Sequence, residues 1–180
     1  MLGGVRSGKS AHAEGLLPAD SPVRYLATGR TVSDADPGAE PDTDWLARIA
    51  EHRARRPPSW VTVEAGDPVA VISAACPDDP PLLLDDVATW LTGVLDDHGV
   101  WDGGPAELAA AREQVRALVD AVAGCPARLV LVSSEVGLGV VPATRSGRLF
   151  RDELGRCNAL LAGACHEVLL LVAGIALRLR

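Results

Sequence analysis

The stretch "GGVRSGKS" (3–10) is the feature that most constrains the fold of this chain. Its spacing, Gly3-x4-Gly8-Lys9-Ser10, matches the phosphate-binding loop that joins a strand to a helix in nucleotide-binding domains. Lys9 is the only lysine in the chain, and the other 16 basic residues are arginines. A slim ammonium group fits a nest of backbone N–H groups, where a planar guanidinium fork does not. The loop therefore predicts phosphate binding, and a chance glycine-rich turn is the alternative.

Each part of this loop has a chemical task. Glycines let the backbone curl without a Cβ in the way, so that successive N–H groups point at phosphate oxygens. We expect Lys9 to reach the β- and γ-phosphates and the Ser10 hydroxyl to bind Mg²⁺, at the positive end of a helix that begins near Ser10. Only Met1 and Leu2 precede Gly3, whereas a strand usually needs about five residues. The leading strand is thus expected to be truncated or vestigial, unless the start of the chain is set too far downstream.

Strand-like and helix-like segments alternate along the rest of the chain. Apolar, β-branched runs predict strands at 23–29, 60–65, 81–86 and 128–135, and one or two more within 167–180. Helical periodicity predicts helices at 43–55, 68–76, 87–97, 105–125 and 144–165, and a long polar loop covers 32–42. This order predicts one α/β domain over residues 1–180, with a mostly parallel sheet and helices on both faces.

Charge, apolar runs and cysteine spacing argue against several classes of protein. The net charge of −7 argues against a surface that coats nucleic acid. The longest apolar run (168–177) is too short to span a bilayer, and the N-terminus lacks the pattern of a secretory signal. The four cysteines show no metal-binding spacing, so we expect reduced thiols in a cytoplasmic protein.

A second part of a nucleotide site is predicted where the apolar run "PLLLDD" (81–86) ends in two acids. Asp85 or Asp86 would lie near the metal ion, at the end of a buried strand. Strands often end in aspartate, so the motif is weak by itself. The sequence leaves open which of the two acids is the relevant one.

His52 stands among arginines in "RIAEHRARRPPSW" (48–60). On a helix, Arg48, His52, Arg55 and Arg56 share one face. Flanking guanidinium groups lower the pKa of a histidine, which keeps the imidazole neutral and nucleophilic near pH 7. They would also bind a triphosphate and stabilise the charge of departing pyrophosphate. The alternative is a solvated basic face with an incidental histidine, and the spacing of the other three histidines indicates no role.

Several blocks together resemble a known family. They are "GGVRSGKSAHAE" (3–14), "YLATGR" (25–30), "RIAEHRARRPPSW" (48–60), "LLLDDVATWLTGVL" (82–95), "VLVSSEVGLGVVPATRSGRLFRDELGRCNALLA" (130–162) and "EVLLLVAGI" (167–175). The chain is similar, nearly end to end, to the bifunctional adenosylcobinamide kinase/adenosylcobinamide-phosphate guanylyltransferases of cobalamin biosynthesis.

This resemblance implies a RecA-like fold of the P-loop NTPase class, assembled as a homotrimer. It implies phosphorylation of adenosylcobinamide with ATP or GTP, followed by transfer of GMP from GTP to adenosylcobinamide phosphate. By similarity, His52 is the guanylylated residue and Lys9 the second catalytic residue, while Ser10 and Asp85 are the metal ligands. The implied nucleotide contacts are Gly3, Gly4, Val5, Arg6, Ser7, Gly8, Lys9, Ser10, Ala27, Thr28, Gly29, Arg53, Ala54, Arg55, Arg56, Glu64 and Asp85. The loop "SEVGLGVVP" (134–142), with Glu135, is expected to form part of the corrinoid or active-site wall.

Two other functions fit part of the sequence. A P-loop small-molecule kinase without nucleotidyl transfer would need no nucleophilic histidine. A non-enzymatic nucleotide-binding regulatory module would bind nucleotide without turning over a corrinoid. The chain also departs from the family pattern, since Leu2 stands at the position of a threonine and Ser134 at that of a common asparagine.

Overall fold

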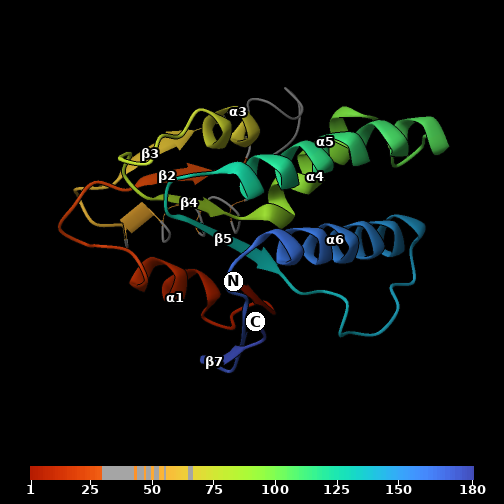
Figure 1. Cartoon of the computed structure of the whole chain (residues 1–180). Helices are drawn as coiled ribbons and strands as arrows, with labels where there is room; N and C mark the ends of the chain where they lie inside the picture. Colours follow the sequence, from red (N-terminus) through yellow and green to blue (C-terminus); the bar gives the residue numbers. More distant parts are fainter. Residues whose placement is uncertain (30–42, 44–46, 48–49, 51–52, 55, 65–66) are drawn as a thin grey trace.

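A computed structural model describes residues 1–29, 43, 47, 50, 53–54, 56–64 and 67–180 (Figure 1). The strands are β1 (Leu2–Gly3), β2 (Arg24–Ala27), β3 (Val61–Glu64), β4 (Leu82–Asp85), β5 (Leu129–Ser134), β6 (Leu169–Val172) and β7 (Ile175–Arg178). The helices are α1 (Lys9–Gly15), α3 (Pro68–Ser73), α4 (Val87–Asp97), α5 (Pro105–Gly124) and α6 (Arg145–Ala164). The long loop predicted at 32–42 and most of the helix predicted at 43–55 lie outside the described residues.

The strands form one sheet in the order β3-β2-β4-β5-β1-β6-β7. All neighbouring strands are parallel except β6 and β7, which form an antiparallel hairpin at one edge. This confirms the predicted mostly parallel α/β fold. The strand before the glycine-rich loop spans two residues and still pairs with β5 and β6 on either side.

Strand β4 shows how both faces of the sheet are buried. Leu82, Leu83 and Leu84 are all 0% exposed, and their side chains alternate between the two faces. Leu82 and Leu84 belong to the large core beneath α3, α4, α5 and α6, whereas Leu83 packs in a smaller core with Ala13 of α1 and with Trp60. Figure 1 shows the corresponding layers, with α1 on one side of the sheet and the other helices opposite. The prediction of helices on both faces is confirmed.

Two polar contacts place α6 against its neighbours. Arg112 of α5 donates two hydrogen bonds to Glu153 of α6, at 2.9 and 2.6 Å, and this contact raises the pKa of Arg112. Asn158 accepts from the Ser133 hydroxyl at 2.6 Å and donates to the Ser134 carbonyl at 3.0 Å. Asn158 and Glu153 are both buried, so these bonds satisfy groups that would otherwise be costly. The Asn158 bonds hold the carboxyl end of β5 against α6, and the Arg112 bonds join α5 to α6.

The described residues contain no helix with the length and apolarity needed to cross a membrane. All four cysteines are free thiols. Cys157 is buried in the large core, and this burial raises the pKa of its thiol to about 12. It therefore acts as a small core residue.

The buried position of Leu84 gives a test of the core. Replacing Leu84 with alanine should lower the free energy of unfolding by about 2–5 kcal/mol, because a cavity would remain in close-packed surroundings. Leu138 is 81% exposed, so Leu138→Ala is the matched control and should change stability by less than about 0.5 kcal/mol. Urea denaturation followed by circular dichroism measures both. Equal losses in the two variants would contradict this assignment of the core.

Candidate active site at the carboxyl edge of the sheet

The predicted site segments meet at one edge of the sheet because β1, β2, β4 and β5 are parallel. The glycine-rich loop follows β1, Thr28 follows β2, Asp85 ends β4, and Glu135 follows β5. In open α/β sheets, ligands bind in the crevice outside the carboxyl ends of the strands. The topology thus brings together residues that are far apart in the sequence.

The loop between β1 and α1 is closely packed against the sheet. A Cβ on Gly3 would lie 2.4 Å from the Ser7 hydroxyl oxygen and 3.0 Å from the Leu171 carbonyl oxygen, so no side chain fits there. Gly8 adopts a positive φ of 88° directly before α1. The backbone N–H of Glu135 donates to the Gly3 carbonyl at 3.0 Å. These contacts fix the shape of the loop from both sides.

Lys9 and Ser10 begin α1 at the end of this loop. Lys9 is half-buried, and within the described ranges its ammonium group forms no ion pair. The Ser10 hydroxyl donates to the Asp85 carboxylate at 3.3 Å. This brings together the serine and one of the two acids that the sequence proposes as metal ligands.

The two adjacent acids have different roles. Asp85 faces Ser10, whereas the Asp86 carboxylate accepts from the backbone N–H of Thr89 at 2.7 Å and caps the start of α4. The Thr28 hydroxyl donates to the Asp86 carbonyl at 2.8 Å and accepts from the Asp86 N–H at 3.0 Å. Thr28 therefore fastens the end of β2 to the end of β4. Gly29 follows it and is half-buried.

Sequence reasoning did not select Tyr25, which contacts Asp85 from the other side. Its hydroxyl donates to the second carboxylate oxygen of Asp85 at 2.5 Å. Tyr25 is 1% exposed, and burial, followed by the charge of Asp85, raises the pKa of its phenol far above the usual value. The phenol is therefore a permanent donor. The available signal was a lone tyrosine, the only one of the chain, within an apolar strand where its hydroxyl needs a partner.

Arg56 stacks on the ring of Tyr25. Its guanidinium carbon lies 3.5 Å from the ring centroid, and Nη1 donates to the Thr62 hydroxyl at 2.8 Å. Its Nε is buried without a hydrogen-bond partner among the described residues. The end of the arginine block is thus in contact with the residue that binds Asp85.

The other predicted contacts are described only in part. Arg53 and Ala54 are exposed, while Arg48, His52 and Arg55 lie outside the described residues. Glu64 ends β3, and its backbone is in register with Ala27 of β2.

The described residues contain no cluster of three or more His, Cys, Asp or Glu side chains that could hold a metal ion. A closed protein cage is not needed for Mg²⁺, which binds one or two carboxylates together with water and substrate phosphates. The Ser10 hydroxyl and the Asp85 carboxylate are two hard oxygen donors beside a phosphate-binding loop. This donor set fits Mg²⁺.

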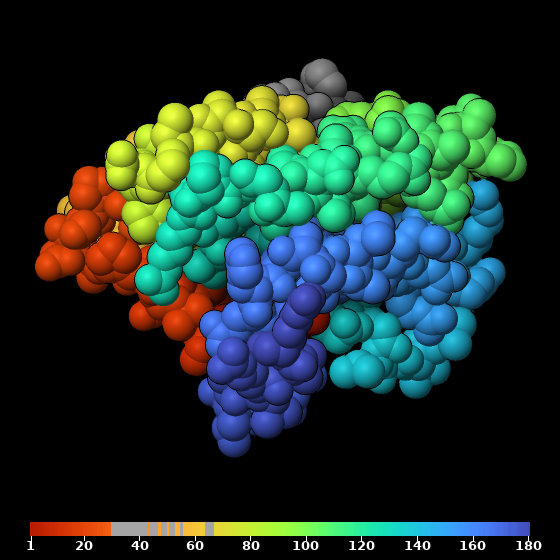
Figure 2. All heavy atoms as spheres, viewed as in Figure 1, coloured from red at the N-terminus to blue at the C-terminus, as the bar shows by residue number. Residues whose placement is uncertain are grey.

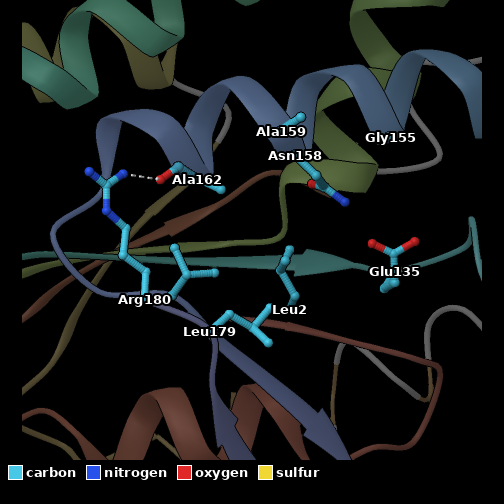
Figure 3. A pocket seen from close by; sticks show the side chains of 9 residues that line it. Leu2, Glu135, Gly155, Asn158, Ala159, Ala162, Leu179 and Arg180 are labelled. Carbon is cyan, nitrogen blue, oxygen red and sulfur yellow. Dashed lines mark hydrogen bonds between the residues drawn. The ribbon is translucent and has the colours of Figure 1, made fainter.

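A cavity of about 350 Å³ lies next to this edge, between α6 and the C-terminal residues (Figure 3). Its polar side chains already have partners. Glu135 accepts from the Gly137 N–H at 2.7 Å, Asn158 binds the end of β5, and Arg180 donates to the last carbonyls of α6. Beyond Glu135, the loop exposes Leu138 and Val140, which are 81% and 94% accessible.

Comparison with known proteins identifies close relatives. The sequence model of the family described as cobinamide kinase / cobinamide phosphate guanyltransferase matches residues 1–179. The chain is 40% identical over 187 residues to the bifunctional adenosylcobalamin biosynthesis protein CobU of Escherichia coli (strain K12), covering 100% of this chain and 98% of that relative. It is 38% identical over 186 residues to the bifunctional adenosylcobalamin biosynthesis protein CobP of Pseudomonas aeruginosa (strain PAO1), covering 100% of this chain and 95% of the relative.

The packing of Gly3 gives a test that needs no substrate. Gly3→Ala should lower the free energy of unfolding by about 1–3 kcal/mol, because the new Cβ overlaps the Ser7 hydroxyl and the Leu171 carbonyl. The matched control is Gly4→Ala, since a Cβ on Gly4 meets nothing within 4 Å. Thermal and urea unfolding without nucleotide compare the two. A Gly4 variant that loses as much stability as the Gly3 variant would refute this view of the loop.

Proposed function

Since this chain belongs to the cobinamide kinase / cobinamide phosphate guanyltransferase family, we propose that it carries out both reactions in adenosylcobalamin biosynthesis. It would phosphorylate adenosylcobinamide with ATP or GTP, and then transfer GMP from GTP to adenosylcobinamide phosphate. The observation that carries the proposal is the match over residues 1–179. That range includes both the phosphate-binding loop and the block around His52, so the single domain 1–180 would hold both activities.

In the kinase reaction, the hydroxyl oxygen of the corrinoid side chain attacks the γ-phosphorus of the nucleoside triphosphate. The bond from this phosphorus to the β-phosphate oxygen breaks, the nucleoside diphosphate leaves, and the hydroxyl proton is released. The loop N–H groups from Gly3 to Ser10 would hold the β- and γ-phosphates, and Lys9 would neutralise charge on the transferred group. The absence of an ion-pair partner for Lys9 within the described ranges supports this role.

Ser10 and Asp85 would hold Mg²⁺, which would supply positive charge to offset the negative charge of the phosphates. Their hydrogen bond supports this assignment, because the two oxygens already lie on one side of the loop. Asp86 has a structural task at the start of α4, which favours Asp85 as the ligand.

In the guanylyltransferase reaction, an imidazole nitrogen of His52 would attack the α-phosphorus of GTP. The bond to the β-phosphate oxygen breaks and pyrophosphate leaves, so that GMP is bound to the ring. A phosphate oxygen of adenosylcobinamide phosphate then attacks this phosphorus, the P–N bond breaks, and adenosylcobinamide-GDP forms. Splitting the transfer in this way replaces one difficult step by two easier ones. Arg53, Arg55 and Arg56 would offset the charge of the departing pyrophosphate.

The remaining nucleotide contacts are proposed at the ends of two neighbouring strands. Ala27, Thr28 and Gly29 would contact the nucleotide from the end of β2, and Glu64 from the end of β3. Their proximity is supported by the parallel register of these strands. Val5 is 72% exposed and Arg6 is also exposed, so both can contact a ligand above the loop.

We also propose a homotrimer that works in the cytoplasm, where ATP and GTP are available as donors. The C-terminal hairpin supports assembly. It projects from the body of the protein, as Figure 2 shows in dark blue. Ile175, Leu177 and Leu179 on it are 66%, 49% and 59% exposed. Apolar side chains on an edge strand are typical of a surface that pairs with another chain.

Labelling with GTP that carries ³²P at its α-phosphorus tests the transfer reaction. The wild-type protein should acquire an acid-labile, alkali-stable label, and His52→Ala should acquire none because the nucleophile is absent. His52→Ala should keep the kinase activity, because phosphoryl transfer needs no histidine. Lys9→Met is the companion variant and should lower the kinase kcat by about 10²–10³-fold.

Two results would replace this proposal with another function. A wild-type protein that phosphorylates adenosylcobinamide but takes up no label would be a kinase only. A protein that binds nucleotide without turning over any corrinoid would be a binding module.

The hairpin gives a test of assembly. Ile175→Asp should convert the trimer to monomers, because it places a charge on the apolar surface of β7. Sedimentation velocity measures the change. Glu167→Asp, a conservative change of an exposed residue before β6, should leave the trimer intact. A wild-type protein that sediments as a monomer would contradict the proposal.

A further inference from the structure

We propose that Tyr25 is a positioning residue shared by the two halves of the active site. Its hydroxyl orients the Asp85 carboxylate beside the phosphate-binding loop. Its ring holds the guanidinium of Arg56, at the end of the arginine block, by a cation–π contact. This inference rests on the proposed function and assigns a role to a side chain that lies beneath the proposed metal and nucleotide contacts.

The first half of the argument concerns the two oxygens of Asp85. One accepts from Ser10 at 3.3 Å, and the other accepts from Tyr25 at 2.5 Å. A carboxylate held at one oxygen can still rotate about its Cβ–Cγ bond, whereas a donor on the second oxygen fixes the plane of the group. Tyr25 is 1% exposed and lies in the small core with Leu83 and Trp60, so its hydroxyl is rigidly placed. Hydrogen bonds to metal-binding carboxylates commonly change metal affinity by about 10–100-fold.

The second half concerns Arg56. Its guanidinium carbon lies over the phenol ring, 3.5 Å from the centroid, and its Nη1 donates to the Thr62 hydroxyl. A cation over an aromatic face contributes about 0.5–2 kcal/mol, depending on burial. Arg56 is four positions after His52 in the sequence. The Tyr25 ring therefore anchors Arg56, the last arginine of the sequence block that includes the proposed nucleophile.

The first experiment removes only the hydroxyl. Tyr25→Phe keeps the ring for Arg56 but takes the donor from Asp85. The probe is adenylyl imidodiphosphate, a non-hydrolysable ATP analogue, titrated by calorimetry with Mg²⁺ and with EDTA. The gain in affinity that Mg²⁺ provides should fall about tenfold or more, while binding in EDTA stays within about twofold of wild type. The rate of ³²P labelling at saturating GTP and Mg²⁺ should also stay within about twofold.

The second experiment removes only the cation. Arg56→Met keeps the phenol on Asp85 but leaves the ring without its partner. The labelling rate at saturating GTP should fall about two- to thirtyfold, the range that corresponds to a lost cation–π contact. The Mg²⁺ effect on the analogue should stay within about twofold. Arg56→Lys should recover part of the rate, because an ammonium over the ring restores the attraction.

The matched control is Trp60→Phe. Trp60 is 8% exposed, its ring centroid lies 6.4 Å from that of Tyr25, and its indole N–H donates to the Pro18 carbonyl. This variant disturbs the same core without removing a contact to Asp85 or Arg56. It should lower the melting temperature and leave both readouts within about twofold.

Loss of the Mg²⁺ effect in Tyr25→Phe and loss of labelling rate in Arg56→Met, with an unaffected control, support the proposal. The proposal is overturned if Tyr25→Phe retains the full Mg²⁺ effect, or if Trp60→Phe reproduces its loss. An unchanged labelling rate in Arg56→Met would overturn the second half. The calorimetric readout needs no corrinoid and no turnover. A wild-type protein without either activity would therefore refute the proposed function and still leave the Tyr25–Asp85 half to be decided.

Discussion

The carboxylate of Asp85, with one hydroxyl donor on each oxygen, is the interaction on which the organisation of the site depends. It exists because of strand register. Tyr25 of β2 is in register with Leu83 of β4, and Asp85 follows two residues later, so all three side chains point to the face that α1 covers. Ser10 lies at the start of α1 on that face. A slip of one residue in β4 would turn Asp85 toward the opposite core and separate it from both donors.

Most of the fold could be predicted because strong, local signals fix it. The apolar runs before Asp85 and Ser134 predict buried strands, and the structure has β4 and β5 there. The long helices α5 and α6 begin and end within one residue of the predicted ranges, with Pro105 and the Thr144 hydroxyl at their starts. The order of the strands in the sheet could not be predicted from such local signals. It depends on which edges pair, and the placement of β1 between β5 and β6 is not encoded in the two residues of that strand.

The site could be predicted only as far as its motifs extend. The glycine-rich loop and the acid at the end of β4 follow known patterns, and the structure brings Ser10 and Asp85 together. Sequence reasoning could not choose between Asp85 and Asp86, because both end the same apolar run and only the start of α4 decides that Asp86 is its cap. Tyr25 was missed for a related reason. A tyrosine in an apolar strand reads as a core residue, and its partner comes from a strand whose position depends on tertiary pairing. His52 lies outside the described residues, so its proximity to the nucleotide stays a prediction.

The phenol of Tyr25 lies between the Asp85 carboxylate and the Arg56 guanidinium, and so contacts both charged groups. If Arg56 bound Asp85 directly, the ion pair would neutralise the carboxylate and compete with a metal ion for its oxygens. Tyr25 separates the two groups, because its hydroxyl binds the anion and the face of its ring binds the cation. The raised pKa of the phenol keeps it protonated, so it donates to Asp85 without adding a second negative charge. Both groups are thus held by one side chain without pairing with each other, as the proposed metal-binding and nucleotide-binding roles would require.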